Sequence, residues 1–463
     1  MKTSRRSFFK KSSLAAAAAA TMPYAWTAES RASESRTKDA NSELTIAAIG
    51  VGGSRGRYNR GGAIAMQASK FGRMIAVCDV DALHAAEFNK KFGGKLKTYT
   101  DYRKLFEKEK PDIVTIGTPD HWHVPIAIAA LRAGCDVYCE KPLTLTIEEG
   151  QILCDVVRET KKVFQVGTQQ RTEYGRNFLR AVALVRSGRL GKNVNAALAI
   201  GGAPSGGPFQ PKPVPKELDW DMWLGPAPEA PYMPERRKLF RWWLEYSGGK
   251  MTDWGAHHID IAVWALGGDD IGPVAVQGTG KFPPVITDEF DPIAFLAGKQ
   301  KLPHCFNTAV EFNIDLTLAN GATIKVTHSY QSEDGETKFG NGILFEGDQG
   351  RIFVNRGKLT GKPVEELTEQ EKKDLDERVF RLYNGKEPTS HMADFFDCVR
   401  SRSLPISDVF THHRTMTCCH LCNITLLLKR PLRWDPLTEQ FHDDEQANAL
   451  RTRPRRKPYT LEV

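Results

Sequence analysis

Two kinds of hydrophobic pattern alternate over residues 44–167. Short, nearly continuous apolar runs are typical of strands buried on both faces of a sheet, and these runs are LTIAAIG, MIAVCD, DIVTIGTP, DVYCEKP and VFQVGT. Helical patterns lie between them: a long one after the first run, then DALHAAEFNKKFG, VPIAIAALRAG and the segment from Thr146 to about Lys161. Gly134 is the expected C-terminal cap of VPIAIAALRAG. Repeated strand–helix–strand units predict a parallel sheet covered by helices on both faces.

The pattern changes after Gly167. A helix is predicted over EYGRNFLRAVALVRSG, and a segment rich in proline and glycine follows from Gly201 to about Pro234. Alternating apolar and polar positions then predict strands in VAVQGTGKF, VEFNIDLTLANGATIKVTHSYQ and ILFEGDQGRIFVN, with Asn320-Gly321 as a hairpin turn. This half is expected to form a mostly antiparallel sheet with helices on one side. The predicted fold class is therefore α/β in two domains, with boundaries near 43–167 and 168–463.

Composition and charge are ordinary for a soluble globular protein. The 463 residues favour two domains, and 41% of them are apolar and 26% charged. After the N-terminus no run approaches the roughly 18 apolar residues that would span a bilayer, so no stable membrane span is expected. The formal net charge is +8, but five of the positive charges precede Ala28 and several more lie in the tail RTRPRRKP. The folded body is close to neutral, which argues against nucleic acid as a partner.

Residues 1–32 have the organisation of a signal peptide: a basic start, a short apolar run and small residues near the end. The segment SRRSFFK at residues 4–10 resembles a twin-arginine export signal, which carries folded proteins and suits a protein that acquires its cofactor in the cytoplasm. An ordinary secretory peptide is the alternative. Cleavage is expected between Ala28 and Ala32, and the mature chain is expected in the periplasm or outside the cell.

The nine cysteines are an odd number, and they show no disulfide framework. One segment, THHRTMTCCHLCNITLLL, gathers His412, His413, Cys418, Cys419, His420 and Cys422. Zinc binds such side chains, but the segment lacks the paired spacing of zinc modules and has the pattern of an amphipathic helix. We expect a core or interfacial helix there, with a metal site as the lesser alternative.

A glycine-rich turn follows the first predicted strand. Gly50, Gly52 and Gly56, with Ser54 and Arg55 before the last of them, stand where a dinucleotide-binding site has its glycines. Glycine lets the backbone approach a pyrophosphate, and the following helix offers unpaired N–H groups at its N-terminus. The last glycine comes one position later than in the usual motif, and a glycine turn without a ligand is the alternative.

The second predicted strand ends in VCDVD, where an acidic side chain can accept hydrogen bonds from the adenosine ribose hydroxyls. Asp79 is the candidate. Its carboxylate would repel a 2′-phosphate, so the expected cofactor is NAD, and NADP is less favoured. The separation from Gly50 to Asp79 exceeds the usual ~20 residues, which we attribute to a longer helical segment after the glycine turn.

The segments GTPDHWHVPIAIAALRAGCDVYCEKPLT and GGKMTDWGAHHID resemble the two signatures of the Gfo/Idh/MocA oxidoreductases. The resemblance extends to LDWDMWLGPAP and RPLRWDP, and the twin-arginine start is typical of versions from planctomycetes and Bacteroidetes. It implies an N-terminal Rossmann fold, a doubly wound parallel sheet, followed by a C-terminal α+β domain with an open, mostly antiparallel sheet behind the nicotinamide. It also implies redox chemistry at a hydroxyl of a small-molecule sugar or polyol, and a homo-oligomer that pairs through the open sheet.

By matching motif, the resemblance assigns roles to residues of this chain. Lys141 is expected to contact the reacting hydroxyl, and His257 to act as acid or base beside Asp253. The residues expected at the cofactor are Thr118, Pro119, His123, Glu140 and Gln169, and Arg171 is expected on the substrate side. The chemistry suits these types, because histidine titrates near neutrality, lysine stabilises alkoxide charge and aspartate can orient an imidazole.

The adjacent histidines in KMTDWGAHHIDIAVW raise the question of a metal. On a helix Asp253 and His257 share a face, whereas His258 is rotated by about 100°. The two histidines therefore cannot easily bind one ion, and no metal is expected. For His258, substrate contact and a structural role stay equally open. Trp242 in RKLFRWWLEY is a candidate for stacking on a sugar ring, with core or dimer packing as the alternative.

Three functions are compatible with these features. The favoured one is a NAD-dependent oxidoreductase that transfers hydride from a hydroxyl of a sugar, polyol or glycoside. The alternative is a redox-neutral NAD-dependent enzyme that processes glycosides by oxidation, elimination and re-reduction. A binding protein without catalysis is disfavoured, because Lys141 and His257 are both present.

Overall fold

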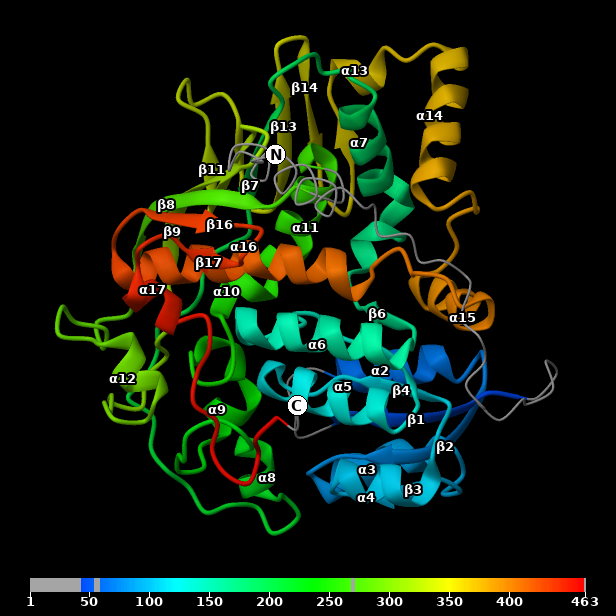
Figure 1. The fold of residues 1–463 in the computed structure, drawn as a ribbon, viewed down its shortest axis with the longest axis vertical. Coiled ribbons are helices and arrows are strands. Elements are labelled where there is room, and N and C mark those ends of the chain that lie inside the picture. Colours follow the sequence, from blue (N-terminus) through cyan, green and yellow to red (C-terminus); the bar gives the residue numbers. More distant parts are fainter. Residues whose placement is uncertain (1–42, 54–58, 268–270, 462–463) are drawn as a thin grey trace, which may run out of the picture. The chain divides into compact units, whose positions relative to one another are not determined.

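The computed structural model describes residues 43–53, 59–267 and 271–461. The predicted signal peptide over 1–32 lies outside the described residues, as do Ser54, Arg55 and Gly56 of the glycine turn. Two large β-sheets and the helices packed on them organise the described chain (Figure 1).

The first sheet has six strands in the order β3-β2-β1-β4-β5-β6. The strands are β1 (Thr45–Ile49), β2 (Arg73–Cys78), β3 (Lys97–Tyr99), β4 (Ile113–Ile116), β5 (Asp136–Cys139) and β6 (Phe164–Val166). Every neighbouring pair is parallel. The order runs outward in both directions from β1 and β4, so a crevice forms where the connections after these two strands diverge. The doubly wound fold predicted for the N-terminal half is confirmed.

Five helices connect these strands: α2 (Arg60–Ala68), α3 (Ala82–Lys90), α4 (Tyr102–Glu109), α5 (His123–Arg132) and α6 (Ile147–Thr160). Helix α6 has its predicted bounds because the Thr146 side chain accepts a hydrogen bond from the Glu149 backbone, and because Lys161 is left-handed. Gly134 after α5 has a φ of +90°, as expected of the predicted cap. The long helix predicted between the first two strands is wrong, because α2 begins only at Arg60 and has 9 residues.

The second sheet has nine strands in the order β15-β14-β13-β7-β10-β9-β8-β16-β17. They are β7 (Asn195–Ala199), β8 (Pro273–Lys281), β9 (Glu311–Leu318), β10 (Thr323–Thr327), β13 (Gly342–Gly347), β14 (Gly350–Val354), β15 (Leu359–Thr360), β16 (Leu432–Asp435) and β17 (Gln440–Phe441); β11 (Tyr330–Gln331) and β12 (Lys338–Phe339) form a separate pair. Among the described strands, β7 and β10 are parallel and the other neighbours in this sheet are antiparallel. The Asn320-Gly321 turn joins β9 to β10 with a φ of +87° at Gly321, so the predicted hairpin is confirmed.

One face of the second sheet is covered by helices. Along β9, Phe312, Ile314, Leu316 and Leu318 are buried, while the residues between them are partly or fully exposed. Helices α7 (Asn177–Arg186), α11 (Gly255–Gly267) and α16 (Val409–Leu428) pack against this sheet. Burial along β9 alternates with a period of two residues, which confirms that the sheet has one side facing the core and one more exposed side.

Helix α16 is buried all round rather than amphipathic, so that prediction is wrong. It packs against α6 on the side of the first sheet and against α11 and β8 on the side of the second (Figure 1). Its cysteines Cys418, Cys419 and Cys422 are buried free thiols. Within the described residues, no group of His, Cys, Asp and Glu side chains has the arrangement of a metal site. The prediction of a core and interfacial helix is confirmed.

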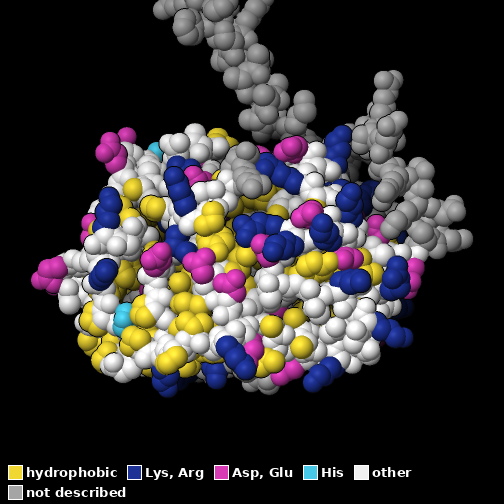
Figure 2. All heavy atoms as spheres, turned by 90° about the horizontal axis from the view of Figure 1, so that it is seen from below, with side chains coloured by type: hydrophobic (Ala, Val, Ile, Leu, Met, Phe, Trp, Pro, Cys, Tyr) yellow, Lys and Arg dark blue, Asp and Glu magenta, His cyan; other side chains and the backbone are white. Residues whose placement is uncertain are grey.

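The remaining helices are shorter or lie at the edges of the two sheets. They are α8 (Trp220–Leu224), α9 (Pro234–Lys238), α10 (Gly249–Asp253), α12 (Pro292–Leu296), α13 (Lys362–Glu365), α14 (Glu369–Leu382), α15 (His391–Ser401) and α17 (Glu445–Ala449). Of the helices in the described ranges, none is both long and apolar enough to cross a membrane. On the face drawn in Figure 2, basic and acidic side chains are interspersed rather than gathered by sign.

Candidate active site

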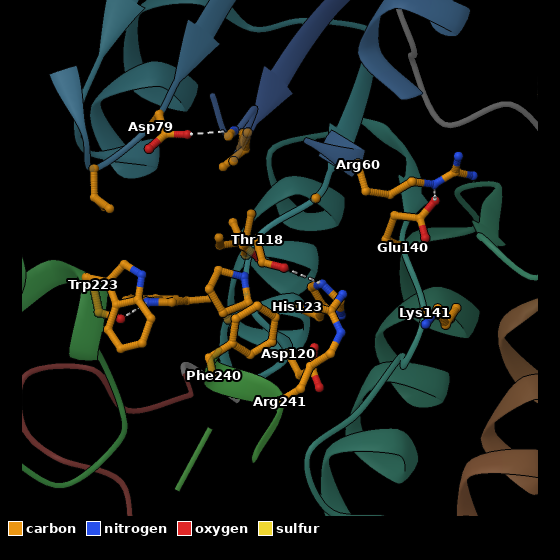
Figure 3. A pocket seen from close by; sticks show the side chains of 18 of the residues that line it. Arg60, Asp79, Thr118, Asp120, His123, Glu140, Lys141, Trp223, Phe240 and Arg241 are labelled. Carbon is orange, nitrogen blue, oxygen red and sulfur yellow. Dashed lines mark hydrogen bonds and ion pairs between the residues drawn. The ribbon is translucent and has the colours of Figure 1, made fainter. Parts of the chain in front are cut away.

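A cavity of about 420 Å³ lies at the carboxyl ends of β1 and β4, where the strand order places the crevice. Its volume is in the range of small-molecule and cofactor sites. Loops of the first sheet contribute Gly50, Gly52, Asp79, Thr118, Pro119, His123, Glu140 and Lys141, and later segments contribute Trp223, Phe240, Arg241, Trp254, His257 and Arg356. Figure 3 shows how several of these side chains surround the cavity from both halves of the chain.

The glycine turn after β1 is crowded by its neighbours. Gly50 and Gly52 have φ values of +73° and +60°, and a Cβ at Gly50 would lie 2.5 Å from the Thr118 side chain. At Gly61, in the first turn of α2, a Cβ would lie 1.8 Å from the Gly50 carbonyl oxygen. The helix therefore reaches the strand only because this position has no side chain. Gly61, which was not predicted, supplies the close helix–strand contact of a dinucleotide-binding turn.

Asp79 follows β2 and lines the same cavity. Its carboxylate accepts hydrogen bonds from the backbone N–H of Gly52 at 3.1 Å and of Asp81 at 3.0 Å. Arg237 also lines the cavity, but it donates to Asp81 in a buried ion pair of 2.5 Å. This end of the cavity therefore contains the carboxylate of Asp79 and the guanidinium of Arg237, whose charge is balanced by Asp81. Such a pair suits ribose hydroxyls better than a 2′-phosphate.

His123 fixes the loop after β4 to the loop after β5. Its Nε2 lies 3.0 Å from the Thr118 carbonyl oxygen, and its Nδ1 lies 2.6 Å from that of Pro142. Burial lowers the pKa of this ring, although both carbonyl contacts oppose the shift. Thr118, Pro119 and His123 line the cavity as predicted, and His123 also holds the turn that carries Lys141.

Glu140 and Gln169 form a hydrogen-bonded wall of the cavity, where they were predicted. Glu140 accepts hydrogen bonds from Arg60 Nε at 2.9 Å (Figure 3) and from Gln169 Nε2 at 3.1 Å. Gln169 also donates to the Tyr138 hydroxyl at 3.0 Å. Because Arg60 is the first residue of α2, its ion pair ties the helix after the glycine turn to the end of β5.

Lys141 and Asp253 join the two halves of the chain inside the cavity. The Lys141 ammonium donates to the Asp253 carboxylate at 2.6 Å and to its backbone carbonyl at 2.9 Å. Arg241 donates to the same carboxylate oxygen at 3.2 Å. Burial alone raises the pKa of Asp253, but the charges of Lys141 and Arg241 outweigh it and hold the pKa well below its usual range. Asp253 is therefore an ionised anchor for two cations.

His257 lines the cavity with 4% of its surface exposed. Burial, followed by the charges of Lys141 and Arg356, lowers its pKa well below 6.5, so the ring is neutral at neutral pH. Its Nδ1 is buried and has no hydrogen-bond partner in the described chain. The expectation that Asp253 orients this imidazole is wrong, because that carboxylate binds Lys141 and Arg241 instead. The helix expected through both residues is also interrupted, since α10 ends at Asp253 and α11 begins at Gly255.

Three predicted substrate residues lie outside the residues that line the cavity, namely Arg171, His258 and Trp242. Arg171 is buried and makes a two-pronged ion pair with Asp260 at 2.7 and 2.8 Å. His258 lies between Gln170 at 3.3 Å and Asn341 at 3.2 Å, contacts that favour the structural role over substrate contact. Trp242 packs in a second cluster of aromatic side chains, while its neighbours Phe240 and Arg241 face the cavity.

Several residues that line the cavity were not predicted. They are Asp120, Tyr174, Trp223, Arg237, Phe240, Arg241, Trp254 and Arg356. Asp120 directly follows Thr118 and Pro119, which were predicted to line the pocket, so its place in the sequence could have indicated that it lines the cavity too. Its buried carboxylate accepts a hydrogen bond from the Ser247 hydroxyl at 2.5 Å, and burial raises its pKa to about 6. Arg356 lies in a turn far along the chain, where no local pattern marks it.

Residues 217–241, which we name the strap, are hydrogen-bonded to the loop that carries Asp79 and contribute side chains to the cavity. The Ala82 N–H donates to the Glu217 carbonyl at 2.9 Å, and the Asp219 N–H donates to the Val80 carbonyl at 2.9 Å. The strap also carries Arg237 of the buried ion pair with Asp81, and the cavity-lining side chains of Trp223, Phe240 and Arg241. The strap is thus hydrogen-bonded to the first sheet at the end of the cavity that holds Asp79.

Comparison with known proteins identifies both halves of the chain. Residues 44–168 match the model of an oxidoreductase family with an NAD-binding Rossmann fold. Residues 206–283 and 285–461 match the model of the C-terminal alpha/beta domain of an oxidoreductase family. Together the two matched regions extend over most of the described chain.

Two curated relatives are similar over part of their length. The chain is 28% identical to the D-glucoside 3-dehydrogenase of Escherichia coli (strain K12) over 202 residues, which is 42% of this chain and 46% of that protein. It is 31% identical to glycosyl hydrolase family 109 protein 2 of Shewanella sp. (strain ANA-3) over 216 residues, 42% of this chain and 45% of that protein. The matched region therefore spans less than half the length of each.

A solved structure shares the fold over nearly its whole length. It is the WlbA dehydrogenase from Bordetella pertussis in complex with NADH and UDP-GlcNAcA. The TM-score is 0.58, and the match covers 85% of this chain and 99% of that one. At 14% identity this likeness speaks for the fold alone.

The carboxylate of Asp79 generates a prediction about cofactor preference. We expect the purified protein to bind NAD more tightly than NADP, and Asp79→Ser to reduce that preference by about tenfold or more, because it removes both a charged acceptor and a repulsive charge. Titration calorimetry with both cofactors measures the ratio. Asp155→Ser, at an exposed position of α6, is the matched control and should keep the wild-type ratio. Equal binding of NAD and NADP by the wild type would mean that Asp79 does not face the ribose.

Proposed function

Because the chain belongs to the Gfo/Idh/MocA oxidoreductase family, we propose that it is a NAD-dependent enzyme that oxidises a hydroxyl of a sugar, polyol or glycoside. One observation carries the proposal. The ammonium of Lys141 and the neutral imidazole of His257 line the same cavity, between the glycine turn and the strap. Oxidation of an alcohol needs a cation at the oxygen and an acceptor for its proton, and this cavity supplies both.

The residues of the cavity fit a dinucleotide. Gly50 packs closely against Thr118 and has no side chain, so its backbone lines the cavity directly. The carboxylate of Asp79 lines the same cavity. We propose that Gly50, Gly52 and Asp79 hold the adenosine diphosphate portion, and that Thr118, Pro119 and Glu140 hold the nicotinamide riboside. When bound there, NAD supplies the acceptor for the hydride that leaves the substrate carbon.

Lys141 and His257 divide the proton chemistry between them. Lys141, fixed by Asp253, donates a hydrogen bond to the reacting oxygen and stabilises negative charge on it. His257 takes the hydroxyl proton, because it lines the cavity and its lowered pKa keeps the imidazole neutral. Trp223 and Phe240 of the strap line the cavity with aromatic side chains.

A redox-neutral glycoside-processing enzyme is the second candidate, and the strap favours it. We infer that the Ala82–Glu217 and Val80–Asp219 hydrogen bonds, which hold the strap to the loop that carries Asp79, slow the exchange of a bound dinucleotide. A cofactor that is slow to leave suits a cycle in which the substrate is oxidised and later reduced again. The relative named as a glycosyl hydrolase is similar over 42% of this chain. Net accumulation of NADH with sugar supports the dehydrogenase, whereas glycoside cleavage without it supports the redox-neutral cycle.

We propose in addition that the protein is exported by the twin-arginine route and acts in the periplasm as a homo-oligomer. The SRRSFFK segment supports the route. The more exposed side of the second sheet, with Asn313, Asp315 and Thr317 outward on β9, supports pairing of two copies through that sheet. A solution mass of one chain by light scattering would contradict the assembly.

The roles of Lys141 and His257 predict a loss of turnover without a loss of cofactor. His257→Ala and Lys141→Ala should each lower kcat by about 10²–10⁴-fold, the usual range for a positioned acid–base group, and keep NAD binding. The double variant should lose less than the product of the two, because both side chains act on one hydroxyl. Sugars, polyols and glycosides are screened first by NADH formation, and kcat is then compared.

His258→Ala is the control for these variants, since the adjacent imidazole does not line the cavity. It should lower thermal stability through its lost contacts with Gln170 and Asn341 more than it lowers kcat. Chelators should leave the wild type unchanged. Near-normal turnover of His257→Ala would remove His257 from the mechanism, and loss of activity with a chelator would establish a metal.

The twin-arginine assignment predicts the behaviour of one double variant. Arg5→Lys combined with Arg6→Lys should leave a folded precursor in the cytoplasm, because the route recognises the arginine pair. Fractionation of cells that express the full chain measures the distribution, with Lys10→Arg as the control that keeps the pair. Unchanged export of the double variant would indicate an ordinary secretory signal.

A further inference from the structure

Arg356 enters the cavity from the turn between β14 and β15, and two aromatic rings hold it. Its guanidinium carbon lies 4.6 Å from the centre of the Tyr174 ring and 4.7 Å from that of the Trp254 ring. All three side chains line the cavity. Two such contacts fix the plane of the guanidinium and leave its N–H groups to point along that plane.

Among the residues that the structure describes, Arg356 differs from the other arginines of the cavity in making no ion pair with a carboxylate. The others are paired, Arg60 with Glu140, Arg237 with Asp81 and Arg241 with Asp253. Within the described chain no ion pair includes Arg356, and its Nε is buried without a hydrogen-bond partner. Burial lowers the pKa of Arg356 below its ordinary value, yet an arginine stays charged under all ordinary conditions. A partly buried cation without a counter-ion is costly, and a ligand anion would remove that cost.

The charges at this end of the cavity leave room for one further negative charge. The cations are Lys141, Lys250, Arg241 and Arg356, and the carboxylates are Asp120, Glu173 and Asp253. Asp253 is already shared between Lys141 and Arg241. With the three carboxylates ionised against four cations, one positive charge remains, and it matches a monoanion better than a phosphate dianion. A planar guanidinium also matches the two oxygens of a carboxylate.

We propose that the substrate is a sugar that bears a carboxylate, such as a uronic acid, an aldonic acid or a glycoside of one, and that Arg356 binds this carboxylate. The proposal rests on the proposed function, because it names the substrate class of the same cavity. Arg356 and His257 line the same cavity, so the bound carboxylate and the reacting hydroxyl belong to the same sugar unit in this proposal.

A bound carboxylate has a second effect, on the base. The positive charge of Arg356 is one of the causes that lower the pKa of His257. When the substrate carboxylate neutralises that charge, the pKa of His257 rises and the imidazole becomes a stronger base. An acidic sugar should therefore have both a higher kcat and a higher affinity than a neutral sugar of the same configuration.

The test compares matched acidic and neutral sugars on the NAD-loaded protein. Methyl glycosides of glucuronic, galacturonic and mannuronic acid are paired with those of glucose, galactose and mannose, and binding is measured by calorimetry and kcat/KM by NADH formation. We expect the wild type to bind at least one acid about 10–100-fold more tightly than its neutral partner, the range of a charge-assisted hydrogen bond.

Three variants assign this preference to Arg356. Arg356→Met should abolish the ratio of acid to neutral affinity, because methionine keeps contact with the rings but carries no charge. Arg356→Lys should keep part of the ratio, since it keeps the charge without the planar fork. Arg351→Met, at an exposed position of the same hairpin, is the matched control and should keep the full ratio.

The outcomes separate this proposal from the function beneath it. Turnover of neutral sugars with no acid preference would overturn the carboxylate site and leave the oxidoreductase intact. Acid binding that depends on Arg356 without any hydride transfer would support the site and overturn the proposed reaction. A preference for sugar phosphates over uronates would overturn the carboxylate assignment, as would an acid preference that survives in Arg356→Met.

Discussion

The ion pair between Lys141 and Asp253 is the contact on which the rest of the site depends. Lys141 comes from the turn after β5 and Asp253 from the end of α10, so the 2.6 Å contact closes the cavity between the first sheet and the helices of the second. Asp253 keeps Arg241 as a partner when Lys141 is removed, whereas removal of Asp253 leaves two cations without their shared carboxylate, which is the more destabilising change. The same contact aims an ammonium at the cavity that His257 lines.

The cofactor end obeys a steric constraint rather than an electrostatic one. Helix α2 approaches β1 so closely that Gly61 meets the Gly50 carbonyl, and this contact sets the shape of the turn around Gly52. Arg60 then ties the start of the helix to Glu140, directly before Lys141. Backbone packing on one side and ion pairs on the other thus fix the distance between the glycine turn and the reacting groups.

Local patterns predicted those features that depend on local interactions. The bounds of α6, the hairpin at Asn320-Gly321 and the parallel order of the first sheet follow from caps, turn chemistry and apolar period. Side chains on motif loops also faced the cavity as expected. The errors concern residues with long-range partners. Arg171 was expected at the substrate, but the buried carboxylate of Asp260 lies across the fold and binds it.

The same reason explains what was missed. Helix α16 has elements packed on all its sides, and a sequence pattern cannot show how many neighbours will cover a helix. Arg356 becomes a cavity residue only because the turn after β14 brings it against Tyr174 and Trp254. Among the described residues Arg356 makes no ion pair, and this is why we assign it to a ligand anion. The local sequence cannot show this, because ion pairs depend on the three-dimensional arrangement.

We infer that hydride leaves a sugar carbon whose hydroxyl is held by Lys141 and deprotonated by His257. Rapid mixing of the NAD-loaded protein with a sugar labelled with deuterium at the reacting carbon tests it directly. In the wild type we expect NADH absorbance to appear within the first turnover, whether or not NADH later accumulates. The absorbance should rise more slowly with the deuterated sugar. It should not appear in Lys141→Ala or in His257→Ala. Conversion of the sugar with no transient NADH and no isotope effect would contradict it.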